Sequence, residues 1–517
     1  MRKSVLRNFL DSYSKRRQLH FYENSVARYK DCIFFLIRED LDRRIIILHP
    51  LRSATSKLIE EFESSETGQF MDPITRETFA YNVCPCNHHN ANLIRKVFDF
   101  TRPRLGNIGP AIGTGDRIGL ATPGHVRAIK NFSVFPIFAQ QSVREMQRTE
   151  RTPEDVLDDV TWGVFQEGYR KGFGADADHL KSLEDIDSAV KIGFRMFTID
   201  PSDYVDNQAD VYSPEILMDK FKALPWREIK CNMNRFLEIY LDKEYKLQSS
   251  GEYYVLRFSE ENLMRAAVKY SKAILFTKKA FSYLKKSFGR KRFDLEMSID
   301  ETETPTSPLE HFFITSELKR LKVRFTGLAL RFIGRFEKAI DYIGDIKEFE
   351  ETFKRHVIIA RAMGPYKISI HSGSDKFAIY PILGKYASDI VHLKTAGTSY
   401  LEALRIVARH DPSLFREIVA YSLRTFERDR KSYHVSTDLS KIPDAADVPD
   451  EDLEKTFLEE NNARQLLHIT YGSILTARSD GKWLFRDRLR RLLIQYEEEH
   501  YNTVAEHICR HAKLIWG

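Results

Sequence analysis

Residues 367–376, KISIHSGSDK, alternate between apolar and polar side chains and then end in a dense group of polar ones. Successive side chains of a β-strand point to opposite faces, so Ser369 and His371 share one face while Ile368 and Ile370 share the other. Polar side chains on the inner face of a sheet are costly to bury unless they are used. The stretch therefore predicts a barrel strand that ends in an active site.

Other short strand-like segments occur along the chain, and helical patterns such as residues 153–171 and 307–321 separate them. Alternation of strands and helices is typical of a parallel sheet of the α/β class, and eight repeats predict a (β/α)8 TIM-like barrel. In that fold the catalytic groups lie at the carboxyl ends of the strands. With 366–371, the predicted strands are 117–122, 133–140, 173–178, 194–200, 293–300, 323–330 and 390–395.

Three regions lie outside this barrel pattern. Residues 1–105 predict an N-terminal α/β extension with strands near 32–37 and 44–49. The barrel is predicted to occupy 106–400, interrupted by an inserted helical subdomain at 204–290, because that segment is too long for one barrel helix. Residues 401–517 predict a C-terminal helical region that wraps the barrel.

Composition limits the class of protein. The 517 residues are 42% hydrophobic, which supports a sizeable core, and the net charge of +6 is too small to predict nucleic-acid binding. Five sparse cysteines favour a reducing compartment, so we expect a cytoplasmic protein. Because neither a signal peptide nor an apolar run of spanning length is found, we expect no membrane partner and a small-molecule substrate.

Two predicted strands carry carboxylates in positions that suit catalysis. Asp294, Glu296, Ser298 and Asp300 alternate along one face of a strand, and carboxylates that point into a barrel must be paired, protonated or bound to a cation. The alternative is an edge strand with its polar face in water. Asp178 ends another strand and is a candidate acid or base; the alternative is that Asp178 and His179 cap the next helix.

Glu296, His371 and His392 would bring one carboxylate and two imidazoles together from different strands. Such a mixed oxygen and nitrogen site suits a divalent Zn, Mn, Ni, Co or Fe ion. For each histidine alone, a hydrogen-bonded place in the core is an equal alternative. The segment CPCNHH at 84–89 has the residue types of a metal site, but its spacing matches no standard zinc module, so we expect an ordinary polar loop.

Five ordered motifs extend the interpretation: GDRIGLATPGH (115–125), GADADHLK (174–181), DETETPT (300–306), SIHSGSDK (369–376) and HLKTAG (392–397). With these motifs the chain resembles the tagaturonate/fructuronate epimerase family over residues 105–515. The resemblance implies a metal-dependent isomerase that interconverts D-tagaturonate and D-fructuronate in hexuronate catabolism. Members of the family are also associated with the neutral ketoses fructose and tagatose.

The resemblance also implies roles for single residues. Glu145, Asp178 and Glu296 are implied as functional carboxylates, and His371 and His392 as metal or substrate contacts. The carbon inverted between the two ketohexuronates is β to the carbonyl, so simple enolisation cannot invert it. Since no dinucleotide fingerprint is found, we favour retro-aldol cleavage and aldol re-addition, with Asp178 and Glu145 as bases on opposite faces of the substrate.

The substrate carboxylate needs a cationic pocket, for which Arg117, Lys376 and Lys394 are candidates. Structural salt bridges are the alternative for Arg117 and Lys376. Competing functions are a metal-dependent aldolase or isomerase of another sugar acid or ketose, including a fructose/tagatose 4-epimerase, and a non-catalytic sugar-acid sensor. Further predicted substrate contacts are Gln141, Ser142, Thr198, Asp300 and Asp375.

Overall fold

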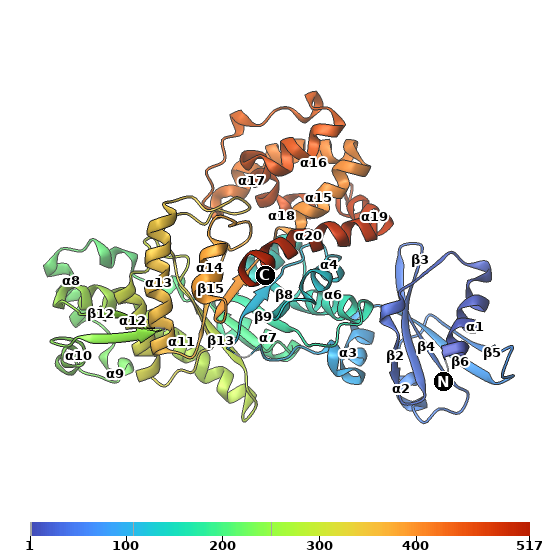
Figure 1. Ribbon diagram of the computed structural model, residues 1–517, viewed down its shortest axis with the longest axis horizontal. Coiled ribbons are helices and arrows are strands. Elements are labelled where there is room, and N and C mark those ends of the chain that lie inside the picture. Colours follow the sequence, from blue (N-terminus) through green and yellow to red (C-terminus); the bar gives the residue numbers. More distant parts are fainter. Residues whose placement is uncertain (1–2, 107, 250, 396) are drawn as a thin grey trace.

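The computed structural model describes residues 3–106, 108–249, 251–395 and 397–517, so Ala396 of the HLKTAG motif lies outside the described residues. Within them, eight parallel strands close into a barrel in the order β10-β13-β14-β15-β16-β7-β8-β9 (Figure 1). The prediction of a (β/α)8 barrel is therefore confirmed. The barrel strands are β7 (Ala111–Gly113), β8 (Phe135–Ser142), β9 (Gly174–Leu180), β10 (Met196–Ile199), β13 (Asp294–Ser298), β14 (Gly327–Ala329), β15 (Lys367–Ile370) and β16 (Val391–Lys394).

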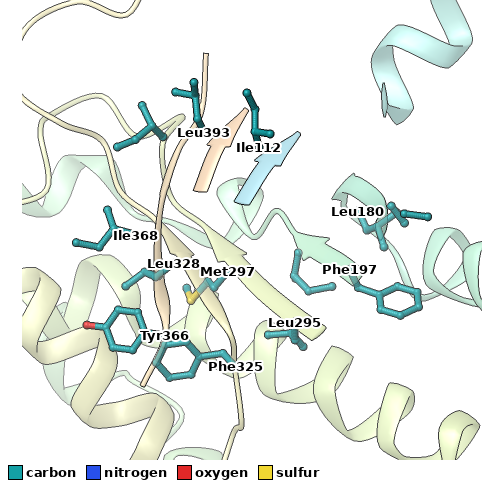
Figure 2. Close-up of a cluster of buried hydrophobic side chains, with 14 of the residues drawn as sticks. Ile112, Leu180, Phe197, Leu295, Met297, Phe325, Leu328, Tyr366, Ile368 and Leu393 are labelled. Atoms are coloured by element: carbon teal, nitrogen blue, oxygen red, sulfur yellow. The ribbon is translucent and has the colours of Figure 1, made fainter. Parts of the chain in front are cut away.

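Apolar side chains on the outer faces of the strands pack against the surrounding helices. Leu295, Met297, Leu328 and Ile368 are fully buried in this layer (Figure 2). Full burial of one such side chain stabilises the fold by roughly 1.5–3 kcal/mol. Helices that surround the barrel include α5 (Val143–Thr149), α6 (Pro153–Gln166), α7 (Leu183–Ile192), α12 (Pro308–Arg320), α13 (Ile346–Met363) and α14 (Tyr380–Ala387).

The first barrel strand lies elsewhere than predicted. Residues 117–122 form a loop that leads into α4 (Thr122–Ile129), and β7 at Ala111–Gly113 takes the strand position. The Asp116 carboxylate accepts hydrogen bonds from the backbone N–H groups of Gly119 at 2.7 Å and Ala121 at 2.6 Å. Those N–H groups cannot also join a strand ladder, so the alternation of apolar residues in this segment was misleading.

The N-terminal residues form a separate antiparallel sheet beside the barrel, at the right of Figure 1. Its strands are ordered β1-β3-β4-β6-β5, with β2 paired to β3. Helix α1 (Lys3–Tyr13) places Phe9 on one face of this sheet, where it packs against Phe35 and Phe70. The strands are β1 (Leu19–Phe21), β2 (Ala27–Tyr29), β3 (Cys32–Glu39), β4 (Asp42–Pro50), β5 (Glu66–Met71) and β6 (Thr78–Pro85).

A largely helical insertion follows β10 and lies at the opposite end of the molecule (Figure 1). Its longest element, α11 (Glu260–Phe288), begins after Ser259, whose side chain accepts from the backbone N–H of Asn262. Helix α11 then leads back into β13 of the barrel. The other elements are α8 (Pro214–Lys222), α9 (Trp226–Ile229), α10 (Met233–Tyr240) and the hairpin strands β11 (Tyr245–Ser249) and β12 (Glu252–Leu256).

The C-terminal helices cover one side of the barrel (Figure 1) and enclose a second hydrophobic core, to which Ile118 and Leu120 of the barrel region also contribute. Helix α20 (Glu497–Trp516) packs against α4 and α14 of the barrel. Among the described residues, no helix is both long and apolar enough to cross a membrane. The preceding helices are α15 (Ser399–His410), α16 (Pro412–Asp429), α17 (Asn461–Ile469), α18 (Tyr471–Thr476) and α19 (Arg486–Gln495).

Candidate active site

A cavity of about 430 Å³ opens at the carboxyl ends of the barrel strands. Residues from or just beyond β8, β9, β13, β15 and β16 line it, which is where catalytic groups of this fold lie. Six of the predicted site residues have charged or imidazole side chains that line this cavity, and they come from separate places in the sequence. They are Arg117, Glu145, Asp178, Asp300, His371 and Lys394.

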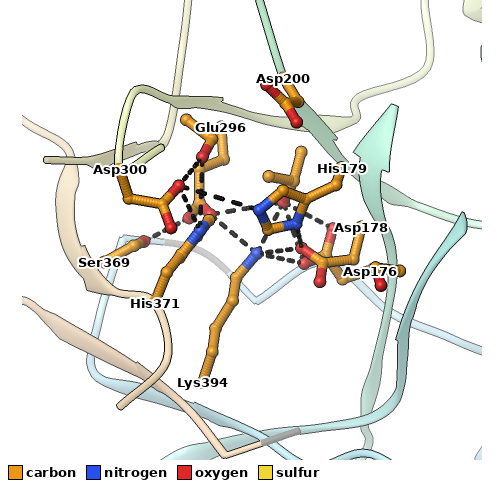
Figure 3. A network of polar contacts seen from close by, with 12 residues as sticks. Asp176, Asp178, His179, Asp200, Glu296, Asp300, Ser369, His371 and Lys394 are labelled. Atoms are coloured by element: carbon orange, nitrogen blue, oxygen red, sulfur yellow. Dashed lines mark hydrogen bonds and ion pairs between the residues drawn. The ribbon is translucent and has the colours of Figure 1, made fainter. Parts of the chain in front are cut away.

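Lys394 is the central cation of the site. Its ammonium nitrogen lies 2.9 Å from Asp176, 2.7 Å from Asp178 and 2.9 Å from Glu296 (Figure 3). Burial by itself would lower the pKa of Lys394, but these carboxylates outweigh burial and raise it well above its usual value. Burial likewise would raise the pKa of Asp178, but Lys394 and His179 outweigh it and lower that pKa. Asp178 is therefore held as a carboxylate.

Asp176 lies one layer deeper and behaves differently. Burial outweighs the nearby Lys394 and raises the pKa of Asp176 to about 6. The Thr198 hydroxyl donates to Asp176 at 2.9 Å, so Thr198 supports the floor of the site and does not line the cavity. The predicted substrate contact of Thr198 does not fit this position.

His371, Asp300 and His179 form a set of metal-type donors at the cavity wall, called the mouth set below. Their donor atoms all lie within 4.8 Å of one another, and His371 Nδ1 is 3.1 Å from Asp300 Oδ1 (Figure 3). Burial would lower the pKa of His179, but the carboxylates of Asp178 and Asp300 raise it well above its usual value. Two histidines and one carboxylate beside open space have the composition of a divalent metal site.

The mouth set differs from the predicted ligand set of Glu296, His371 and His392. Glu296 is fully buried, and its Oε1 lies 2.8 Å from Nε2 of His371. Asp300 contacts the other ring nitrogen of His371, so the two carboxylates lie on opposite sides of the ring. His392 is also fully buried, where burial lowers its pKa to about 4, and it does not line the cavity. The structure thus places Glu296 and His392 beneath the mouth set, because both side chains belong to the packed interior of the barrel.

His179 joins the site through an irregularity that simple alternation does not anticipate. In the pairing of β9 with β10, Ala177 lies opposite Phe197 and Leu180 lies opposite Ile199. Strand β9 therefore has one more residue than β10 between these two pairs. The extra residue is a β-bulge, and His179 has a left-handed φ of 57°. Both Asp178 and His179 consequently line the cavity, although neighbours in a regular strand would face opposite sides.

Glu145 and Arg117 form the opposite part of the wall. Glu145 sits in the first turn of α5, where Ser142 caps the helix and exchanges hydrogen bonds with Glu145. A guanidinium nitrogen of Arg117 lies 2.7 Å from the Glu145 carboxylate, and the guanidinium stacks 3.6 Å over the ring of Tyr471. The C-terminal helices thereby fix this side of the cavity.

The predicted substrate contacts at Asp375, Lys376 and Gln141 do not line the cavity. Lys376 Nζ donates to three backbone carbonyls, including that of Glu337 at 2.8 Å, and burial lowers its pKa to about 8. Asp375 pairs with Arg464 at 2.9 Å, and Gln141 accepts from Arg151 at 3.3 Å. The chain turns away from the cavity after Ser372, so sequence adjacency to His371 does not bring these groups to the site.

The CPCNHH segment at 84–89 is a strand-to-helix connection. Asn87 caps α3 (His88–Val97) by accepting from the backbone N–H of Asn90, and His88 pairs with Asp158 at 2.7 Å. Within the described residues the segment does not gather three donor atoms in metal-binding range. Only Cys86 and Asn87 lie between the two elements, since β6 ends at Pro85 and α3 begins at His88, so the segment is not the loop that was expected.

Comparison with known proteins identifies the family to which the chain belongs. A model of a family described as tagaturonate epimerase matches residues 22–515. The chain belongs to this tagaturonate epimerase family. It is therefore an isomerase, as the resemblance implied.

Relatives of the family match along their whole length. A tagaturonate/fructuronate epimerase from Thermotoga maritima is 46% identical over 513 residues, which is 99% of this chain and 100% of that protein. Crystal structures of fructuronate-tagaturonate epimerase from Cohnella laeviribosi, one with glycerol and one native, superpose with TM-scores of 0.89 at 38% and 37% identity. Each covers 99% of both chains.

Proposed function

We propose that this epimerase interconverts D-tagaturonate and D-fructuronate, with the help of a divalent metal ion. One observation carries the proposal. The same cavity contains the mouth set and two ion-paired carboxylates, Asp178 and Glu145, that lie on separate elements. The names of the relatives support the substrate pair.

His179, Asp300 and His371 would hold the metal ion, and Zn, Mn, Ni, Co or Fe(II) all suit such donors. When bound, the ion would supply Lewis-acid polarisation of the ketone and hydroxyl oxygens of the substrate. Glu296 accepts from Nε2 of His371 and so orients the ring from behind. In this proposal Glu296 is a positioning residue.

Retro-aldol chemistry accounts for inversion at a carbon β to the ketone. Loss of the β-hydroxyl proton lets the bond between the α- and β-carbons break, which yields the enediolate of a three-carbon ketone and a three-carbon aldehyde. Rotation of the aldehyde presents its other face, and re-addition of the enediolate restores the bond with the opposite configuration. Each oxygen needs a group that takes and returns its proton.

Asp178 and Glu145 would exchange those protons from different sides of the cavity. Asp178 stays ionised because Lys394 is 2.7 Å away, so it can accept a hydroxyl proton. A carboxylate with a lowered pKa is a weak base, and it accepts a proton readily only from an acidified hydroxyl. A bound metal ion would acidify that hydroxyl.

The first test follows D-tagaturonate by proton NMR with protein that has been stripped with EDTA and reloaded with single divalent metals. We expect stripping to abolish formation of D-fructuronate and at least one metal to restore it. Full turnover by the stripped, folded protein would contradict the metal requirement. No turnover with any metal would contradict the substrate assignment.

A second test addresses the bond that breaks. Retro-aldol cleavage leaves the C–H bond of the inverted carbon intact, so substrate deuterated there is expected to show only a small secondary isotope effect. A large primary effect would overturn the retro-aldol route in favour of transient oxidation at that carbon.

A further inference from the structure

Most cations around the cavity are already neutralised. Arg117 pairs with Glu145 at 2.7 Å, Arg144 with Glu301 at 2.8 Å, and Lys181 with Asp203 at 3.3 Å, while Lys394 has three carboxylates. A cation that is already paired gains little from a further anion, because its charge is compensated. The lysines and arginines that line the cavity are Arg117, Arg144, Lys181, Lys338 and Lys394.

Lys338 differs from these four. Its ammonium nitrogen lies 2.5 Å from the hydroxyl oxygen of Ser372, and no carboxylate pairs with it among the residues that the structure describes. The neighbouring Glu337 points elsewhere, since its carboxylate accepts from Ser436 and Gln465. Lys338 is therefore the lining lysine or arginine of the described chain that keeps an uncompensated charge.

The position of Lys338 suits one end of an extended substrate. It borders both the cavity of about 430 Å³ and an adjoining one of about 600 Å³. Its partner Ser372 directly follows His371 of the mouth set. A six-carbon acid with its reacting oxygens at the mouth set can therefore extend its carboxylate along this wall.

The backbone that carries Lys338 is held firmly, although it lies in a long connection after β14. Lys376 donates to the carbonyl of Glu337 at 2.8 Å, and Arg464 donates to the carbonyl of Ala339 at 2.7 Å. Both donors are buried. Lys376, a residue predicted to contact substrate, thus fixes the segment that presents Lys338.

We propose that Lys338 binds the carboxylate of the substrate and sets the preference for ketohexuronates over neutral ketoses. The identity of the substrate class rests on the function proposed above. An ammonium to carboxylate hydrogen bond is charge-assisted and stronger than the contact with the Ser372 hydroxyl that it would replace. A neutral ketose leaves Lys338 without this partner.

The test uses two unreactive six-carbon probes, D-gluconate and D-glucitol, which differ in the carboxylate. Calorimetry on the full chain is expected to show tighter binding of gluconate to the wild type. Lys338→Met is expected to weaken gluconate binding by about 10- to 100-fold and to leave glucitol unchanged. Lys338→Arg is expected to retain part of the gluconate affinity, and Lys347→Met, at an exposed lysine, all of it.

Two outcomes would overturn the assignment. One is that the wild type binds gluconate no more tightly than glucitol; the other is that Lys338→Met weakens the binding of both probes equally. Measuring the conversion of D-tagaturonate distinguishes failure of the Lys338 assignment from failure of the proposed function. Wild type that never converts D-tagaturonate, yet binds gluconate through Lys338, would refute the function and leave the carboxylate site in place.

Discussion

Two sets of histidine and aspartate in this molecule have the same composition and different surroundings. The mouth set contains two histidines and Asp300; a second group, the rear set, consists of Asp375, His507 and His511. In each, donor atoms lie within 4.8 Å of one another in the described part of the chain. The sets are close along the sequence, because Asp375 follows His371 by four residues.

The rear set is already paired with an arginine of the protein. Arg464 pairs with Asp375 at 2.9 Å, while Nε2 of His511 accepts from the backbone N–H of Asp375 and Nδ1 of His511 contacts the carbonyl of His507. Burial would lower the pKa of His507, but Glu402 and Asp375 outweigh it and raise that pKa. The guanidinium supplies the positive charge that a metal ion would otherwise bring, so this set acts as a clamp between α20 and the loop after β15.

The mouth set faces open space instead, and the Asp300 carboxylate is paired with the two histidines of the set itself, His371 at 3.1 Å and His179 at 3.8 Å. The comparison teaches that ligand type and spacing do not by themselves make a metal site. Access to open space, and whether an arginine already pairs with the carboxylate, decide the difference. The following experiments test that distinction.

The largest effect is expected from removing the charge of Asp178 beside the mouth set. Asp178→Asn should lower kcat by about 10²- to 10⁴-fold, because the group that takes the hydroxyl proton is lost. NMR of product formation measures it. The same change in the rear set, Asp375→Asn, should lower the unfolding midpoint with a smaller loss of kcat; equal losses of kcat would break the comparison.

Removing Arg464, whose guanidinium pairs with Asp375 of the rear set, is expected to lower the stability of the fold. Arg464→Met leaves the Asp375 carboxylate buried without its cation and should lower the free energy of unfolding by about 3–5 kcal/mol. Urea denaturation provides the measurement. Arg488→Met removes an exposed pair with Glu417, each side chain being 44% exposed, and serves as the control with an expected change within about 1 kcal/mol.

Metal content separates the sets directly. His371→Ala is expected to reduce metal affinity by at least about 100-fold, since loss of an orienting partner alone costs 10- to 100-fold. His511→Ala should leave metal content unchanged after dialysis, as measured by elemental analysis. Loss of metal from His511→Ala alone would show that the rear set is the true metal site.

The smallest effect is expected at a buried pair of histidines that has no carboxylate partner among the described residues. Burial lowers the pKa there, whereas carboxylates raise the pKa of His179 and His507. Nδ1 of His356 lies 3.1 Å from Nδ1 of His311, and burial lowers the pKa of His356 to about 3 from the ordinary 6.5. Between these values the unfolded chain binds more protons, so stability should fall as pH drops below about 6.5, by about 1.4 kcal/mol per unit for this group.

His356→Gln removes that titrating group, so its urea midpoint should depend less steeply on pH between 7 and 5 than that of the wild type. An unchanged pH dependence would show that folding leaves the pKa of His356 at its ordinary value.

Much of the barrel could be predicted because apolar and polar residues alternate along several of its strands. The stretches around Ile368 and Met297 alternate regularly, and both are strands in the structure. The first strand was missed because Ala111–Gly113 is too short to show a period, while the loop at 117–122 imitates one. Hydrogen bonds from that loop to Asp116 have no counterpart in the pattern of apolar residues.

The site was predictable in part, for the same reason. His371 and Lys394 follow from alternation, whereas His179 depends on a β-bulge whose presence one sequence does not reveal. Lys338 lies in a long connection without periodicity, so it had no sequence signature. Asp375 and Lys376 do not line the cavity because neighbours in sequence diverge at a turn.

The clamp on α20 also bears on how the enzyme is made. His507 and His511, near the end of the described chain, hold the loop that begins at His371. Chains emerge from the ribosome N-terminus first, and their folded parts form in that order. Every barrel strand is thus complete before the clamp exists, so a nascent chain interrupted before residue 497 would carry an unfinished catalytic loop. Synthesis itself therefore delays activity until α20 has been made.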